Sequence, residues 1–208
     1  AESWELVGDT QVTMKLRSGI KFQDGTDFNA ESVKWNIQRI LDPAKPLTPR
    51  VELGAIDTID AVSATEVVLK LKQPSAPLLT NLGDRGGQMI SRAALEKLGD
   101  DAFRRAPVGT GPFTLKSWVD DANLTFEANP NYWRKDEIGQ KLPYLQTIQV
   151  ELMPDTTVRT AAFDAGGIDV LIGPAATDVQ RLIRDSNVQI SEFVGSSTAH
   201  WYMNHSFG

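Results

Sequence analysis

The chain has no cysteine and only two histidines among its 208 residues. The absence of cysteine excludes disulfides, cysteine-ligated zinc and thiol catalysis together. His200 and His205 are five residues apart and no helical pattern surrounds them, so they do not form a helix-borne metal motif. No apolar run reaches the roughly 18 residues that a transmembrane helix needs. The sequence therefore predicts a protein with no cofactor and no metal site.

Basic residues are outnumbered and scattered. There are 21 Lys and Arg against 27 Asp and Glu, a net charge of -6, and the densest basic pair is Arg104-Arg105. Binding to nucleic-acid phosphates depends on clustered cations, so we expect no nucleic-acid partner. With 41% hydrophobic and 23% charged residues, the balance is that of an ordinary globular protein.

Motifs for catalysis are also missing. No Gly-x-Ser-x-Gly elbow is present, and Gly195-Ser196-Ser197 lacks the second glycine at the required spacing. Residues 109–112 begin like a dinucleotide fingerprint, but Pro112 and the missing third glycine are incompatible with it, and no Walker lysine follows. Residues 24–27 start like a calcium loop without the later carboxylates. These absences favour a binding module over an enzyme.

Hydrophobic periodicity predicts short strands and helices along the whole chain. The predicted strands are 3–7, 11–17, 55–62, 66–72, 88–90, 113–119, 124–128, 147–153, 168–172, 188–193 and 199–204. The predicted helices are 29–41, capped by Asn29, 78–82, 91–98, closed by Gly99, 155–165, capped by Asp155, and 177–184. The first half is typical of an α+β arrangement and the second half of α/β layering. We place a domain crossing near the rigid segment Pro107–Pro112.

Three segments, in this order, carry a resemblance to a known family. They are residues 16–33 (LRSGIKFQDGTDFNAESV), residues 107–113 with 129–133 (PVGTGPF and NPNYW), and residues 159–170 (RTAAFDAGGIDV). Together they resemble the peptide/nickel-type solute-binding proteins of ABC importers, family 5 of the bacterial extracellular solute-binding proteins. Gln23 stands where the family more usually has His, and Ser32 where it has Asp.

The resemblance implies a part of a two-lobed, type II periplasmic binding protein with mixed sheets flanked by helices. Residues 1–105 would form a small α+β subdomain of the first lobe. Residues 106–208 would form part of the α/β first lobe and end near the hinge, and the second lobe is expected to be absent. Residues 1–20 lack the basic start and apolar stretch of a signal peptide, so we expect a periplasmic protein whose leader is not in this sequence.

Five residues are candidates for contact with a solute. Arg85 lies in a glycine-flanked loop, where its guanidinium fork could meet a carboxylate with two hydrogen bonds. The resemblance implies a cleft-facing position there and another near Arg50. Trp201, Tyr202 and Asn204, near the implied hinge, could line the cleft wall, although strand packing would also explain the two aromatics.

The function that the resemblance implies is capture of a peptide or similar small polar solute for an ABC importer. Its partners would be that solute and the membrane permease, and we expect a monomer. Two alternatives stay open on the sequence alone. The chain could be a fragment of a hydrolase or transferase whose active site lies elsewhere, or an interaction domain without a ligand.

Overall fold

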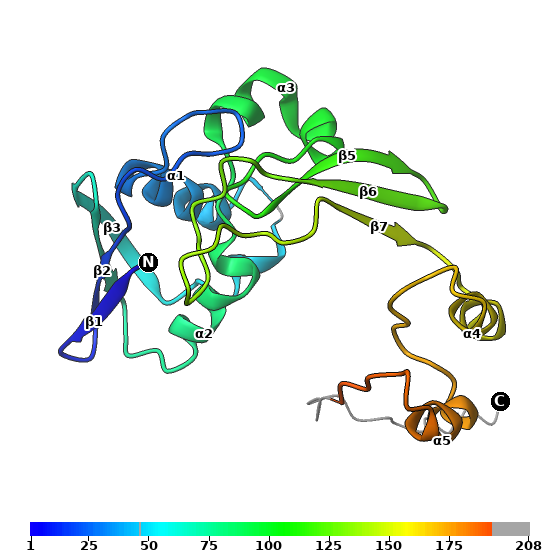
Figure 1. Cartoon of the computed structure of the whole chain (residues 1–208). Coiled ribbons are helices and arrows are strands. Elements are labelled where there is room, and N and C mark those ends of the chain that lie inside the picture. Colours follow the sequence, from blue (N-terminus) through cyan, green and yellow to red (C-terminus); the bar gives the residue numbers. More distant parts are fainter. Residues whose placement is uncertain (46, 193–208) are drawn as a thin grey trace, which may run out of the picture. The chain divides into compact units, whose positions relative to one another are not determined.

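The computed structural model describes residues 1–45 and 47–192. The chain divides into two compact units, residues 1–151 and residues 152–208. Figure 1 gives the order of the elements along the chain. No helix in the described ranges is long and apolar enough to cross a membrane.

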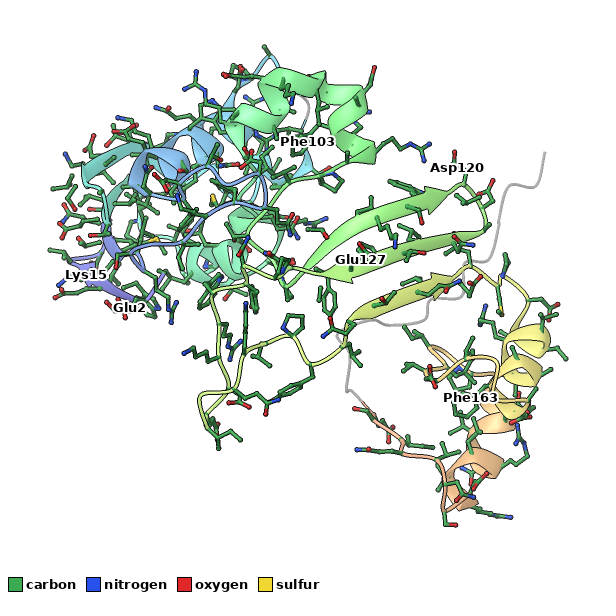
Figure 2. The ribbon with its side chains drawn as sticks, turned by 45° about the horizontal axis from the view of Figure 1, so that its top comes forward. Glu2, Lys15, Phe103, Asp120, Glu127 and Phe163 are labelled. Atoms are coloured by element: carbon green, nitrogen blue, oxygen red, sulfur yellow. The ribbon has the colours of Figure 1, made fainter. Side chains whose placement is uncertain are left out.

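The first unit opens with a four-stranded antiparallel sheet in the order β1-β2-β4-β3. The strands are β1 (Ser3–Val7), β2 (Gln11–Lys15), β3 (Ile56–Ser63) and β4 (Glu66–Leu71). Successive side chains of a strand point to opposite sides of the sheet, so every second residue of each strand lies on its inner face. Val12 lies opposite Leu69 in the register, and both are buried. Figure 2 shows Lys15 and Glu2, whose backbone N–H donates to the Lys15 carbonyl, at the open end of β1 and β2.

Helix α1 (Ala30–Leu41) packs against β3 and β4 and closes the main core. It begins with the predicted cap: Asn29 accepts from the Ser32 backbone N–H at 3.0 Å, and the Ser32 hydroxyl accepts from the Asn29 N–H at 3.1 Å. This reciprocal pair satisfies two amides that a helix start leaves free. Val33, Ile37 and Ile40 form the buried stripe of α1 over the sheet.

The predicted strand at 88–90 is wrong: these residues form no ladder. The partner of this segment is a side chain. Asn36, fully buried in α1, donates to the Ile90 carbonyl at 3.0 Å and accepts from the Ile90 N–H at 3.1 Å. One amide side chain thus satisfies the donor and the acceptor that a neighbouring strand would otherwise pair.

Helix α3 (Arg92–Arg105) consists of two helical parts that meet at Gly99. Gly99 is non-helical, with φ of 78° and ψ of 164°, so the predicted end of the helix 91–98 at this glycine is confirmed and a second helical part follows it. Glycine reaches this left-handed region at little cost. Ser91 caps the start by accepting from the Ala94 N–H at 3.1 Å.

The same Ser91 hydroxyl joins α3 to the turn at Asp24. It donates to one oxygen of the Asp24 carboxylate at 2.5 Å, and the Thr26 hydroxyl donates to the other at 2.6 Å. Burial acts to raise the pKa of Asp24, but the hydrogen bonds from Ser91 and Thr26 outweigh it and hold the pKa below its ordinary value.

A pH dependence follows from this lowered pKa of Asp24. A carboxyl whose folded-state pKa is depressed stabilises the fold above its unfolded pKa, and that stability is lost as pH falls through the folded pKa. We therefore expect the stability difference between wild type and Asp24→Asn to be constant above about pH 5 and to shrink below about pH 4. Urea unfolding at a series of pH values measures it. A difference that grows on acidification would contradict the assignment.

The second sheet of this unit is antiparallel, in the order β5-β6-β7. Its strands are β5 (Phe113–Val119), β6 (Asn123–Ala128) and β7 (Thr147–Glu151). Asn129 ties the two halves of the second motif together, because its side-chain amide donates to the Gly111 carbonyl at 3.0 Å and its backbone N–H to the Pro112 carbonyl at 2.7 Å.

Gln23 links the first motif to the second. Its side-chain amide donates to the Phe113 carbonyl at 2.9 Å, and its side-chain oxygen accepts from the Gly109 N–H at 3.1 Å. The Gln23 backbone N–H also donates to the Gly109 carbonyl at 2.9 Å. The position at which this chain departs from the usual histidine therefore links the two motifs, as does Arg17 of the first motif, which lies 4.8 Å from the ring centroid of Trp133 in the second.

Replacing Gln23 by Ala is expected to lower the free energy of unfolding by about 2 kcal/mol, since it removes these bonds and leaves the half-buried Gly109 N–H without its side-chain partner. Gln23→Glu keeps the acceptor but cannot donate to the Phe113 carbonyl, so an intermediate loss is expected. Urea unfolding checks both. Full stability in Gln23→Ala would show that the bonds do not hold the motifs together.

The sheet β5-β6-β7 and the first sheet belong to one compact unit, residues 1–151. Besides Gln23, an exposed clamp joins the two regions. Arg105, at the end of α3, forms two hydrogen bonds to Asp120 at 2.5 and 2.9 Å and lies 4.4 Å from the Trp118 ring centroid. The bonds raise the pKa of Arg105 and lower that of Asp120. Asp120 is at the hairpin tip in Figure 2. The subdomain boundary at 105/106 stays a prediction.

The second unit contains α4 (Thr156–Asp164) and α5 (Ala176–Arg184). Asp155 caps α4 as predicted, accepting from two backbone N–H groups at 2.8 and 3.0 Å. Arg159 organises the loops around this helix by donating to the carbonyls of Met153, Pro154 and Gly173.

The strand predicted at 168–172 is wrong, and so is the part of the 188–193 strand that falls on described residues. A strand needs a partner for its backbone groups, and no described segment pairs with either one. Val170 and Ile172 are 73% and 82% exposed, so the apolar run that predicted a buried strand is not covered within the described chain. The predicted strand at 199–204 lies outside the described residues.

Candidate functional site

Two short 3₁₀ helices bring the predicted arginines into one loop cluster. η1 (Thr48–Arg50) carries Arg50 at its end, and η2 (Arg85–Gly87) carries Arg85 at its start. The two turns are in contact, and α2 (Leu78–Gly83) leads into η2. We call Arg50, Val51, Glu52 and Arg85 the arginine wall.

Tight backbone packing fixes the position of Arg85. A Cβ added at Gly86 would lie 2.8 Å from the Asn81 carbonyl oxygen and 3.0 Å from Leu53 Cδ2, and one at Gly87 would lie 1.9 Å from the Leu82 carbonyl oxygen. Only glycine allows the chain to pass this close to α2. The two glycines after Arg85 are therefore packing residues, and the glycine-flanked loop is held in place against α2.

An ion pair orients the Arg85 side chain. One Nη of Arg85 lies 2.7 Å from a carboxylate oxygen of Glu52, and the two side chains are 54% and 24% exposed. The Glu52 backbone is fixed in turn, because the Asn81 side chain donates to its carbonyl at 2.9 Å. Since a guanidinium has five donors, Arg85 keeps several for a further carboxylate on its exposed side.

Arg50 lies on the same cluster with its side chain exposed. Beside it, Val51 is 89% exposed, an apolar group next to two cations. The structure thus brings together two of the five predicted site residues. Trp201, Tyr202 and Asn204 lie outside the described residues, so their assignment to a cleft stays a prediction.

Sequence reasoning did not identify Glu52 as part of the site. Nothing local marks it, because its partner Arg85 lies far along the chain and only folding brings them together. An acid two residues after a candidate arginine is a common surface pattern.

A cavity of about 230 Å³ is lined in part by Leu82 and Gly87. Its lining is mostly apolar and includes Met14, Ile37 and Met89. Neither Arg50 nor Arg85 lines it. Arg50, Val51 and Arg85 are exposed, so the arginine wall is an open surface. Among the described residues, no cluster of three or more Asp, Glu or His side chains could hold a metal ion.

Comparison with known proteins gives a consistent result. The model of the family described as bacterial extracellular solute-binding proteins, family 5, middle part, matches residues 1–208. The glutathione-binding protein GsiB of Escherichia coli K12 is 38% identical over 167 residues, which cover 80% of this chain and 31% of GsiB.

Solved structures agree. The periplasmic binding protein AgaA from A. tumefaciens R10, in complex with agropinic acid, is similar with a TM-score of 0.81 and 29% identity, covering 89% of this chain and 37% of AgaA. The binding protein DppA of Helicobacter pylori, in complex with the peptide STSA, gives a TM-score of 0.76 and 27% identity, covering 90% of this chain and 40% of DppA.

These relatives are solute-binding proteins, and the expected fold class, mixed sheets flanked by helices in a type II periplasmic binding protein, is confirmed. The chain spans 31% of the length of GsiB. The match extends over all three motifs that carried the resemblance, and the structure shows two of them joined through Gln23. The chain belongs to family 5 of the bacterial extracellular solute-binding proteins.

Proposed function

We propose that this chain forms one wall of the solute cleft in a periplasmic binding protein of an ABC importer, and that the solute is a peptide or a similar small molecule with a free carboxylate. The observation that carries this is the arginine wall, in which Glu52 holds an exposed Arg85 guanidinium at 2.7 Å. Planar guanidinium groups match carboxylates with paired hydrogen bonds.

The relatives support the class of solute. Glutathione, agropinic acid and the peptide STSA, named for GsiB, AgaA and DppA, all carry carboxylates. An oriented but solvent-open arginine can attract and align such a group. The exposed Val51 beside it would give an apolar part of the solute a surface to cover.

The remaining parts of the proposal follow from the family. The loaded protein would deliver its solute to a membrane permease, act as a monomer, reside in the periplasm and catalyse no reaction. Closure around the solute, rather than chemistry, would signal the loaded state. Trp201, Tyr202 and Asn204 would complete the wall near the hinge.

Calorimetric titration tests the proposal on the full-length gene product, with glutathione and a panel of dipeptides and tetrapeptides. We expect binding of at least one of these solutes, and a loss of about tenfold or more in Arg85→Ala, the worth of a charge-assisted hydrogen-bonded pair. Arg50→Ala should lose less, because no described residue orients its side chain.

Arg104→Ala is the matched control, an arginine whose side chain is 77% exposed on α3, and its affinity should equal wild type. The 208-residue chain alone is expected to bind the same solute much more weakly, since one wall buries little of it. Equal affinity in Arg85→Ala and Arg104→Ala would refute the role of the arginine wall.

A further inference from the structure

A second concave surface lies between α1 and α3. It is a groove of about 560 Å³ with Trp35 and the buried Leu95 as its apolar lining. None of its lining residues belongs to the arginine wall. The helix break at Gly99 forms part of the lining, so the groove lies where the two parts of α3 meet.

Two of the acids that line the groove are already engaged. Glu96 accepts from Arg92 at 2.7 Å, and Asp42 accepts from the Ala44 backbone N–H at 2.9 Å. Both carboxylates keep their negative charge, and the other charged groups of the lining are Arg39, Lys45 and Asp100. Within residues 1–45 and 47–192, none of these three side chains forms a hydrogen bond or a close ion pair. The groove therefore carries two cations and three carboxylates, and Arg39, Lys45 and Asp100 are the charged side chains in it whose polar atoms have no partner in the described chain.

Arg39 is the group whose environment is least satisfied. It is half-buried, lies 5.8 Å from the Trp35 ring centroid, and has no described partner for its buried Nε. Burial lowers the pKa of Arg39, and the nearby charge of Asp100 only partly opposes the effect. Arg159 is also half-buried and its Nε likewise has no described partner, but its terminal nitrogens donate to three carbonyls, whereas those of Arg39 donate to no described group. A half-buried cation that the charge of Asp100 only partly compensates costs free energy, which a bound anion would offset.

We propose that this groove is a second ligand site, specific for a zwitterion of the α-amino-acid type with an apolar or aromatic side chain. Arg39 and Lys45 would take the carboxylate, Asp100 the ammonium group, and Trp35 the side chain. The volume is within the range of small-molecule sites, and an aromatic wall with a few convergent polar groups is their usual composition.

L-Phenylalanine is the probe, titrated into the 208-residue chain while the indole N–H resonance of Trp35 is followed by NMR. Loss of one resonance in Trp35→Phe assigns that signal. We expect saturable shifts in the millimolar range, and binding at least about fivefold weaker for L-phenylalaninamide and for N-acetyl-L-phenylalanine, each of which lacks one charge. Equal shifts with all three compounds, or no shift of Trp35, would overturn the proposal.

Variants separate the groove from the rest of the surface. Arg39→Gln and Asp100→Asn should each weaken binding roughly fivefold, in keeping with one charge-assisted contact in a solvent-open groove. Arg104 lies on α3, as Asp100 does, but does not line the groove, so Arg104→Gln should bind the probe like wild type. Lys45 lies outside the helices, so Lys45→Gln is expected to fold. It tests whether the two cations bind the carboxylate even if Arg39→Gln unfolds. Unchanged affinity in Lys45→Gln and Asp100→Asn would contradict the site.

Discussion

Gly87→Ala is expected to destabilise the first unit by about 3 kcal/mol or more, at the upper end of what overpacking costs. The new Cβ would lie 1.9 Å from the Leu82 carbonyl oxygen and 2.9 Å from the Leu82 carbonyl carbon, which are backbone atoms of α2 and cannot rotate away. Either η2 or the end of α2 must move, and Arg85 would move with it. Urea unfolding measures the loss of stability, and solute titration measures the loss of the oriented arginine.

Gly83→Ala is the matched control, at the end of α2 in the same segment. A Cβ there meets nothing within 4 Å, so the fold should be unchanged, or more stable by up to about 1 kcal/mol through helix propensity. If both variants unfold at the same urea concentration as wild type, the close approach of η2 to α2 is not a constraint on the fold.

Asn36→Leu is expected to cost about 3 kcal/mol, although it replaces a polar residue by an apolar one of similar size in the core. The substitution removes the two hydrogen bonds to Ile90, at 3.0 and 3.1 Å. Their loss leaves the backbone N–H and the carbonyl of Ile90 unpaired. Each buried group left unsatisfied costs roughly 1–3 kcal/mol. Hydrogen exchange of the Ile90 amide should accelerate together with the loss of stability.

Gln38→Leu provides the comparison on the same helix, where the side chain is exposed and makes no hydrogen bond to the described chain. Its expected effect is within about 0.5 kcal/mol. Asn36→Leu with wild-type stability and a still protected Ile90 amide would show that water or a backbone shift replaces the side chain.

Much of the secondary structure could be predicted because its signals are local. The alternation of Val12, Met14 and Leu16, the stripe of Val33, Ile37 and Ile40, and the caps at Asn29 and Asp155 each depend on neighbours within a few residues. The family resemblance has the same local character, since each motif is a continuous segment.

The errors arose where the outcome depended on distant partners. The segment at 88–90 has the composition of a strand, but a side chain of α1 satisfies its backbone, so no ladder forms. At residues 168–172 an apolar run remained exposed, because no described segment pairs with it.

The sequence by itself determined the family, most helices and strands of the first unit and the absence of a recognisable catalytic set, and it singled out Arg85 and Arg50 as candidates. Only the tertiary structure decided that Glu52 orients Arg85, that Gln23 joins two motifs 90 residues apart, and that Arg39 lies beside Trp35 with its buried Nε unpartnered. Periodicity and capping act between near neighbours and leave a pattern in the chain. Ion pairs and hydrogen bonds between distant residues leave none, because they exist only once the core has brought those residues together.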